Sequence, residues 1–215
     1  KDAGLDVIGM GIESVNVDEL KLFRKIANSE QSREAYRRIQ ESGKFCVILG
    51  FIMLSATSTP AIIEEKVEFL RDIRRGWDFL ILTNRLQVFW GTVMHDELVV
   101  AGLSDKGRPR AGYAPYRFFD PHVAALDARI TEIKRQRPEF MEINNLMYDA
   151  INLESRMLNP ANADLLVAAG ERYVQFSERL RIRQAKLSDL YCDAVHDVNT
   201  DPDAPFLPDF NGKSE

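Results

Sequence analysis

Apolar and amphipathic stretches alternate along the first ninety residues, and this alternation is the main structural signal of the chain. The apolar run 4–14 is short and ends in Glu13-Ser14, and a second run, 45–54, ends in a polar loop. Short apolar runs closed by turn residues are typical of strands buried on both faces. Because the intervening stretch, 16–43, has helical periodicity, we predict a βαβ unit whose two strands are parallel.

A third apolar stretch, 79–90, predicts a third strand, because its first half is apolar and its second half alternates polar with apolar residues. In parallel α/β sheets, ligands gather at the carboxyl ends of the strands. The polar residues at these three ends are therefore candidates for a ligand-binding rim: Glu13, Ser14, Ser55, Asn84, Arg85 and Gln87. For the last three, an exposed strand end is an equally good interpretation.

Helix-capping residues mark the helices of this first half. Asn16 predicts the start of a helix over 17–27, and Ser29 the start of a second helix that ends at Gly43. Thr59-Pro60 is typical of a helix start, and we expect that helix to close at Gly76.

The composition of 104–119 shifts to Gly, Pro, Arg and Tyr, which we interpret as a domain boundary. Helices are predicted from Asp120-Pro121, from Pro138 to about 158, and over 161–195 as one long rod. The best available partner for the apolar seam of that rod is the stripe Val123, Leu126, Ile130 and Ile133. The predicted division is thus 1–103, a linker over 104–119, a helical domain over 120–196 and an acidic tail, 197–215, expected to be disordered.

Charge and composition exclude several function classes. The net charge of −5 gives no support to nucleic acid or an anionic membrane as a partner, and no apolar stretch reaches membrane-spanning length. The chain has two cysteines far apart in sequence, Cys46 and Cys192, which fits a reducing compartment, so we expect a cytoplasmic protein. Three scattered histidines predict no metal site. Because the chain starts at Lys1 in the lead-in to a buried strand, we expect a piece of a longer polypeptide.

The order of these motifs resembles a known family. Gly-x-Glu-Ser within 4–14, a helix ending in Gly43, Gly50-Phe-Ile-Met and Gly91-Thr92 with a later Gly102 are similar to the second half of a radical S-adenosylmethionine (SAM) barrel. The likeness covers about 5–103 and is greatest to the branch that often carries an upstream cobalamin-binding domain. It implies an α/β fold: the C-terminal half of a partial TIM-like barrel of parallel strands with helices, followed by an α-helical C-terminal domain.

The chain departs from the family in three places. Residues 54–59 keep only the final Thr of the Gly-Leu-Pro-Gly-Glu-Thr loop, and Trp90 replaces the Pro before Gly91-Thr92. The cluster motif C-x3-C-x2-C is absent, and two distant cysteines cannot supply the three thiolates that such a 4Fe–4S cluster needs. The missing N-terminal part of the same polypeptide would have to supply them.

The resemblance implies reductive cleavage of SAM at a 4Fe–4S cluster to a 5′-deoxyadenosyl radical. In the cobalamin branch, methyl transfer or rearrangement often follows. This chain would be the SAM- and substrate-binding portion, with the cluster and any cobalamin held outside it. No catalytic residue is assigned, and the substrate is expected to be a small molecule or a peptide. A non-catalytic binding module, in which a degenerate barrel remnant carries a helical interaction domain, is the rival hypothesis.

Residues matched to the family motif give the candidate contacts. Glu13 and Ser14 match the polar pair that contacts the ribose or methionyl end of SAM, and Ile52 matches the apolar position that packs on adenine. Arg24 or Lys25 is positioned to reach the SAM carboxylate. Each has an ordinary alternative: a turn cap for Glu13, core packing for Ile52 and a solvated charge for the two cations. The predicted cofactor contacts are Glu13, Ser14, Arg24, Ile52 and Ser55, and the predicted substrate contacts are Asn84, Arg85 and Gln87.

Overall fold

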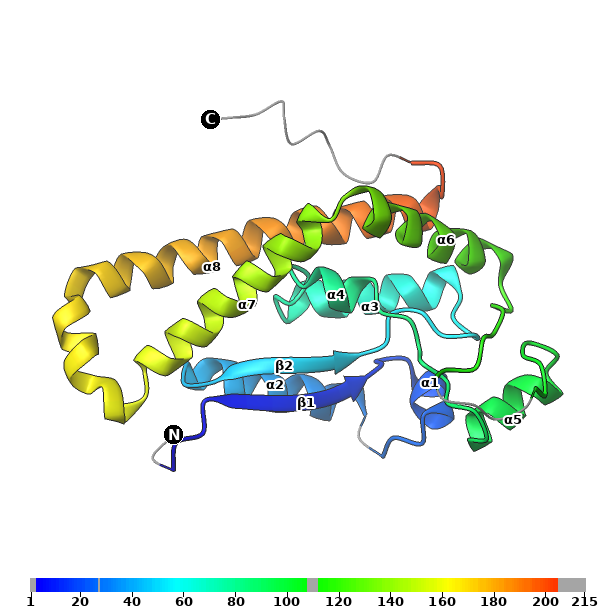
Figure 1. Cartoon of the computed structure of the whole chain (residues 1–215), viewed down its shortest axis with the longest axis horizontal. Coiled ribbons are helices and arrows are strands. Elements are labelled where there is room, and N and C mark those ends of the chain that lie inside the picture. Colours follow the sequence, from blue (N-terminus) through cyan, green and yellow to red (C-terminus); the bar gives the residue numbers. More distant parts are fainter. Residues whose placement is uncertain (1–2, 27, 108–111, 205–215) are drawn as a thin grey trace.

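The computed structural model describes residues 3–26, 28–107 and 112–204. These residues form a mixed α/β fold that is mostly helical (Figure 1). Its elements are, in chain order, β1 (Val7–Glu13), α1 (Val17–Leu22), α2 (Ser29–Ser42), β2 (Cys46–Phe51), α3 (Pro60–Asp72), α4 (Phe79–Leu82), α5 (Val93–Val100), α6 (Pro121–Gln136), α7 (Glu139–Met157), the 3₁₀ helix η1 (Pro160–Asn162) and α8 (Ala163–Thr200).

The predicted βαβ unit is confirmed. β1 and β2 are parallel neighbours, paired from Val7 opposite Cys46 to Gly11 opposite Gly50. A bulge shifts the register after Gly11, so that Glu13 lies opposite Phe51. Helix α1 begins after Asn16, the cap that was predicted. Helix α2 begins one residue earlier than predicted, because Asn28 and not Ser29 is its cap and forms a capping box with Gln31.

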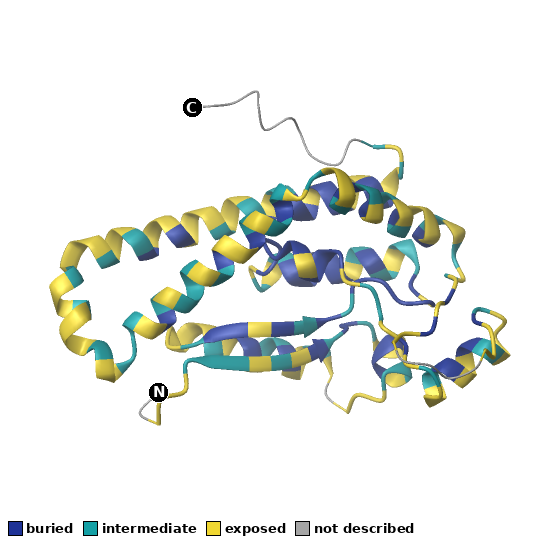
Figure 2. Cartoon of the chain, viewed as in Figure 1, coloured by how far each residue is buried: buried dark blue, intermediate teal, exposed yellow. Residues whose placement is uncertain are grey.

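One face of this two-stranded sheet carries the core. Ile12, Val47, Leu49 and Phe51 are buried there together with side chains of α2 and α3. The ring of Phe51 stacks on Phe69 of α3 at 5.9 Å between centroids. Figure 2 shows the buried positions concentrated where β2, α3, α4 and the second half of α8 meet. The opposite face of the sheet carries Gly9, Gly11, Ile48 and Gly50.

The predicted third strand over 79–90 is wrong: its first half is helical, and its second half forms isolated bridges at Arg85 and Phe89 rather than a strand. Phe79–Leu82 is a short helix, α4, because the Asp78 carboxylate accepts from the N–H of Ile81 and caps it. After this helix the chain still returns to the sheet edge, where Leu54 and Arg85 form a single parallel bridge. Among the described residues the sheet therefore has two strands, and segment 84–86 occupies the place of the third.

The helical second half packs directly on the first. The predicted apolar stripe of α6, Val123 to Ile133, is buried. The predicted partner of α8 is corrected, however, because α8 makes its most extensive contact with α3 and not with α6. The close approach depends on Gly76, because a Cβ there would lie 2.3 Å from the Cys192 sulfur. Gly76 was expected to end α3, but the left-handed residue after that helix is Arg74, with φ of 55°.

The long helix is not one straight rod. Gly170 has non-helical angles, φ 46° and ψ −126°, which interrupt α8 near its start. Beyond this kink the helix continues to Thr200, past the predicted end at 195. The predicted tail begins inside α8, and most of it, 205–215, lies outside the described residues, as do 108–111 of the predicted linker. The domain boundaries themselves stay predictions.

Candidate functional site

The face of the sheet opposite the core is built from glycine. Gly9 and Gly11 of β1 alternate with core residues, and the register sets them beside Ile48 and Gly50 of β2. Gly9, Gly11 and Ile48 are exposed, and a Cβ at Gly9 would meet no atom within 4 Å. The backbone at Gly9 is thus open to a ligand, and we call Gly9, Gly11, Gly50 and Ile48 the glycine face.

Glu13 lies at the carboxyl end of this face. The bulge before it and its positive φ of 66° turn the side chain back along the strand. Its Oε1 lies 2.7 Å from the point where a Cβ of Gly11 would be, so the carboxylate lies over Gly11. Left-handed backbone at a non-glycine residue costs energy, and such residues cluster at ligand sites. The side chain is three-quarters buried, so the carboxylate is held rather than freely solvated.

Lys25 is the cation that the structure places beside Glu13. Its Nζ lies 3.1 Å from Glu13 Oε1. Arg24, the other cation considered, has a left-handed φ of 57° and pairs with Glu97 of α5 at 3.6 Å instead. Ile52 is half-buried next to this end of β1, and its N–H donates to the Glu13 carbonyl at 2.7 Å. The fold therefore brings Glu13, Lys25 and Ile52 to one end of the glycine face.

Ser14 and Ser55 lie below this surface, in a buried polar cluster that sequence reasoning did not anticipate. Both are fully buried, and both hydroxyls donate to the carboxylate of Glu19 on α1, at 2.6 and 2.9 Å. Ser58 donates to the same carboxylate at 2.7 Å. The Lys66 ammonium of α3 lies 2.6 Å from Glu19 and donates to the Met53 carbonyl at 2.9 Å. The cluster thus fixes the loops that follow both strands, and no local signal marks it, because an acidic residue in a first helical turn is normally exposed.

This cluster predicts an acid-sensitive fold. Burial opposes ionisation of Glu19, but the Lys66 ammonium and the serine hydroxyls outweigh it and hold the pKa of Glu19 below its ordinary value. Since the folded pKa is below the unfolded one, the stabilisation is fully present above about pH 4.3 and is lost as the pH falls through the folded pKa. We expect the urea midpoint of the wild-type chain to fall more steeply from about pH 5 to pH 3 than that of Glu19→Gln. Equal slopes would show that folding does not lower the pKa of Glu19.

The three predicted substrate residues come together in one cavity. A cavity of about 590 Å³ is lined by the segment Thr83–Val88, by residues 113–116 and by α6. Asn84, Arg85 and Gln87 all line it. Asn84 joins the cavity to the sheet, because its Nδ2 donates to the Phe51 carbonyl at 2.7 Å. The segment that carries Asn84 and Arg85 therefore lies beside the carboxyl end of β2, although it is not itself a strand.

Arg85 connects the walls of this cavity by hydrogen bonds. Its guanidinium donates to Asp127 Oδ2 at 2.9 Å and to the Tyr116 carbonyl at 2.7 Å. It also lies 4.2 Å from the ring centre of Tyr116 and 4.7 Å from that of Phe118. Asp127 and Lys134, which share one side of α6, were missed from the sequence. Their spacing of seven residues, with Ile130 and Thr131 between them, was the available signal.

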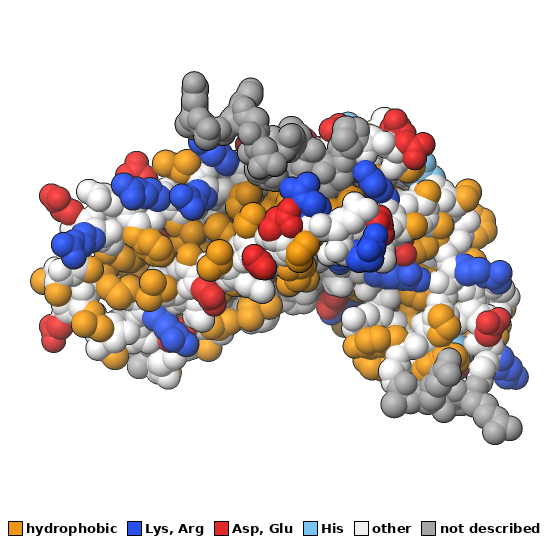
Figure 3. Space-filling view, turned by 45° about the horizontal axis from the view of Figure 1, so that its top comes forward, with side chains coloured by type: hydrophobic (Ala, Val, Ile, Leu, Met, Phe, Trp, Pro, Cys, Tyr) orange, Lys and Arg blue, Asp and Glu red, His pale blue; other side chains and the backbone are white. Residues whose placement is uncertain are grey.

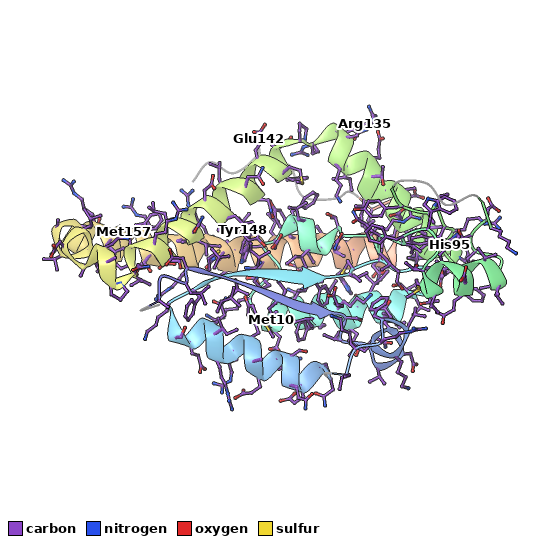
Figure 4. The ribbon with its side chains drawn as sticks, turned by 60° about the horizontal axis from the view of Figure 1, so that its bottom comes forward. Met10, His95, Arg135, Glu142, Tyr148 and Met157 are labelled. Atoms are coloured by element: carbon purple, nitrogen blue, oxygen red, sulfur yellow. The ribbon has the colours of Figure 1, made fainter. Side chains whose placement is uncertain are left out.

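A second cavity, of about 530 Å³, continues the glycine face toward the amino ends of the strands. Val7, Cys46 and Ile48 form its floor, and Tyr148 and Asn152 of α7 line it from above. Tyr148 is held by Arg75, whose guanidinium donates to its hydroxyl at 2.7 Å, and the hydroxyl in turn donates to Asp78. In Figure 4, Tyr148 lies beside α4 and β2, whereas Met10 points away from this side, toward α2. α7 therefore closes one end of the glycine face and leaves the Glu13 end open.

Among residues 3–26, 28–107 and 112–204, no three His, Cys, Asp or Glu side chains are grouped so as to hold a metal ion. Cys46 and Cys192 are both buried, and burial raises the pKa of each thiol. Within the same residues, no helix has the length and apolar character needed to cross a membrane.

Comparison with known proteins gives one structural likeness. No family model matches the sequence, and neither does any curated protein. The fold is similar to the solved structure of OxsB, a cobalamin-dependent S-adenosylmethionine radical enzyme with aqua-cobalamin bound, with a TM-score of 0.54 at 15% identity. The match covers 92% of this chain and 37% of that enzyme, so the chain spans well under half of its structural neighbour. At this identity the likeness concerns the fold alone, a mixed α/β fold with two parallel strands.

Proposed function

We propose that this chain is the SAM- and substrate-binding portion of a radical SAM enzyme, with β1 and β2 forming part of a partial barrel. The observation that carries the proposal is the glycine face with the Glu13–Lys25 pair at its open end. The order of motifs over 5–103 and the fold of the structural neighbour support the same assignment. Because Gly9 has no side chain, a flat ring system can approach the backbone of β1 there, next to the Glu13–Lys25 pair that lies over Gly11.

The residues at the carboxyl end fit the parts of SAM. Glu13 accepts from the ribose hydroxyls or the methionyl ammonium, and Lys25 donates to the methionyl carboxylate, each as a charge-assisted hydrogen bond. Ile52 offers an apolar contact for adenine. Ser14 and Ser55 contribute through Glu19, because their hydroxyls hold the two loops in place. Arg24 pairs with Glu97 and is left out of this assignment. When bound, SAM supplies the adenosyl or methyl group for radical or methyl-transfer chemistry.

The residues of this chain do not fit a 4Fe–4S cluster. The sequence has two cysteines, and the structure buries them on β2 and α8, apart from the Glu13 end of the glycine face. We therefore place the cluster ligands, and cobalamin if the enzyme uses it, in a part of the same enzyme outside this sequence. That N-terminal part is the first partner of the chain. The second is a small-molecule or peptide substrate, held in the cavity of Asn84, Arg85 and Gln87.

A second candidate is a non-catalytic binding module. Exposed apolar side chains gather on α7 and α8, over the left half of Figure 3. Leu146, Leu153, Leu165, Val167 and Val174 are each more than half exposed. Such a patch is typical of a surface that contacts another protein. Iron and cobalamin in the full-length purified enzyme favour the first proposal, and their absence favours the second.

The proposal predicts that adding a side chain at Gly9 prevents SAM binding and leaves the stability of the fold nearly unchanged. Gly9→Val points into open space and places a strand-favouring residue in β1, so its free energy of unfolding should stay within about 0.5 kcal/mol of the wild type. Glu13→Gln keeps the shape but removes the charge, and should weaken SAM binding by about 1–3 kcal/mol. Equilibrium titration of SAM monitored by NMR measures both effects.

Glu30→Gln, on the exposed start of α2, is the matched control and should bind SAM like the wild type. Unchanged SAM affinity in Gly9→Val and Glu13→Gln, with both variants folded, would reject the glycine face as the SAM site.

A further inference from the structure

The cavity lined by Asn84, Arg85 and Gln87 contains more positive than negative charge. Arg85 and Lys134 are cationic, and Asp127 is the acidic residue among those that line it. Arg85 is engaged by Asp127 and by the Tyr116 carbonyl, at 2.9 and 2.7 Å. The single carboxylate among the lining residues is thus already bound, and within the described part of the chain Lys134 forms no ion pair as close as that of Arg85 with Asp127.

Lys134 has the donors that a ligand would need. Its ammonium can donate three hydrogen bonds, and in the described part of the chain it makes one, 2.8 Å to the Thr83 carbonyl. This bond holds Nζ against the segment that begins the cavity wall. Burial lowers the pKa of Lys134, and the charge of Asp127 only partly offsets this effect. A partly desolvated ammonium with free donors is a favourable site for a ligand oxyanion.

The remaining lining suits the body of a small organic molecule. Leu86, Val88, Pro115 and the rings of Tyr113 and Tyr116 form the apolar part of the wall. Asn84, Gln87 and Thr131 add neutral hydrogen-bonding groups. A volume of about 590 Å³ is in the usual range for a small-molecule site.

We propose that this cavity binds a substrate with an apolar or aromatic body and one oxyanion, a carboxylate or a phosphate, which Lys134 binds directly and Arg85 supports. The inference rests on the proposed function in taking the cavity as the substrate site. Asp127 then has two effects: it orients Arg85, and its negative charge weakens anion binding. Removing that charge should strengthen binding, which a purely structural role for the cavity would not produce.

The test is calorimetric titration of the 215-residue chain with phenyl phosphate, benzoate and benzyl alcohol. We expect at least one anion to bind, and benzyl alcohol to bind at least tenfold more weakly. The preferred anion distinguishes a phosphate from a carboxylate substrate. Lys134→Met should weaken anion binding about tenfold, whereas Asp127→Asn should strengthen it about threefold. Lys186→Met, the same substitution at an exposed position of α8 outside the cavity, is the control and should leave binding unchanged.

Three results would overturn the inference: no anion binding to the wild type, equal binding of benzyl alcohol, or equal affinities in Lys134→Met and Lys186→Met. SAM titration of the same samples distinguishes this failure from failure of the proposed function. SAM binding without anion binding rejects the substrate class alone. Anion binding without SAM binding rejects the SAM assignment and leaves the anion site in place.

Discussion

Replacing Lys66 by Met is expected to lower the free energy of unfolding by about 3–5 kcal/mol, among the largest effects of any single substitution in this chain. Met has nearly the length of Lys, so little volume is lost. The Glu19 carboxylate, however, stays fully buried without the ammonium that lies 2.6 Å from it. Chemical denaturation monitored by circular dichroism measures the change.

The matched control is Lys21→Met on the exposed side of α1, where the ion pair with Asp18 is solvated and the expected cost is below about 0.5 kcal/mol. Adding Glu19→Gln to Lys66→Met should restore more than half of the loss, because the amide oxygen still accepts from the serines while the buried charge is gone. A cost below about 1 kcal/mol for Lys66→Met alone would mean that the pair is not part of the core.

Gly76→Ala is expected to destabilise the fold by about 3 kcal/mol, at the upper end for overpacking. The added Cβ would lie 2.3 Å from the sulfur of Cys192, 2.6 Å from the hydroxyl of Ser188 and 3.0 Å from the Ser188 carbonyl. Because the last of these is backbone, α8 would have to move away from the loop after α3. The free energy of unfolding from urea titration measures the effect.

Gly9→Ala is the control for this prediction, since a Cβ there meets open space and should cost nothing. Combining Gly76→Ala with Cys192→Ala should recover part of the loss by removing the sulfur in the way. If Gly76→Ala were as stable as Gly9→Ala, the close packing of α8 on the loop after α3 would be wrong.

Elements with a local signal were predictable from the sequence. Asn16, Thr59 and Asp120 cap helices in the structure as their sequence context indicated, since a cap depends on neighbours within three residues. The apolar runs of β1 and β2 were likewise sufficient for the parallel pair. The run after Asp78 was not, because an apolar stretch of four residues fits a buried strand and a buried helical turn equally well. The hydrogen bond from the Ile81 N–H to the Asp78 carboxylate favours the helical turn.

Some residues of the candidate site were likewise predictable from the sequence, and others were not. Glu13, Asn84, Arg85 and Gln87 were predicted to lie on a rim at the ends of strands. In the structure Glu13 ends β1, whereas the other three lie on the segment after α4 and line one cavity. The choice between Arg24 and Lys25 depended on the left-handed turn at Arg24, which directs Lys25 toward Glu13. The burial of Ser14 and Ser55 depended on Glu19 and Lys66, which come from two helices far apart in the sequence. Such long-range pairs leave no pattern in a single sequence.

The central claim is that SAM lies on the glycine face, and glycine-selective ¹⁵N labelling tests it most directly. The chain has 12 glycines, so each amide can be followed individually by NMR during a SAM titration. We predict that the amide signals of Gly9, Gly11 and Gly50 shift together and saturate at one SAM concentration, while those of Gly43 and Gly102, outside the sheet, stay in place. Saturation of the chain by SAM with Gly9, Gly11 and Gly50 unmoved, or no shift of any glycine, would contradict the account.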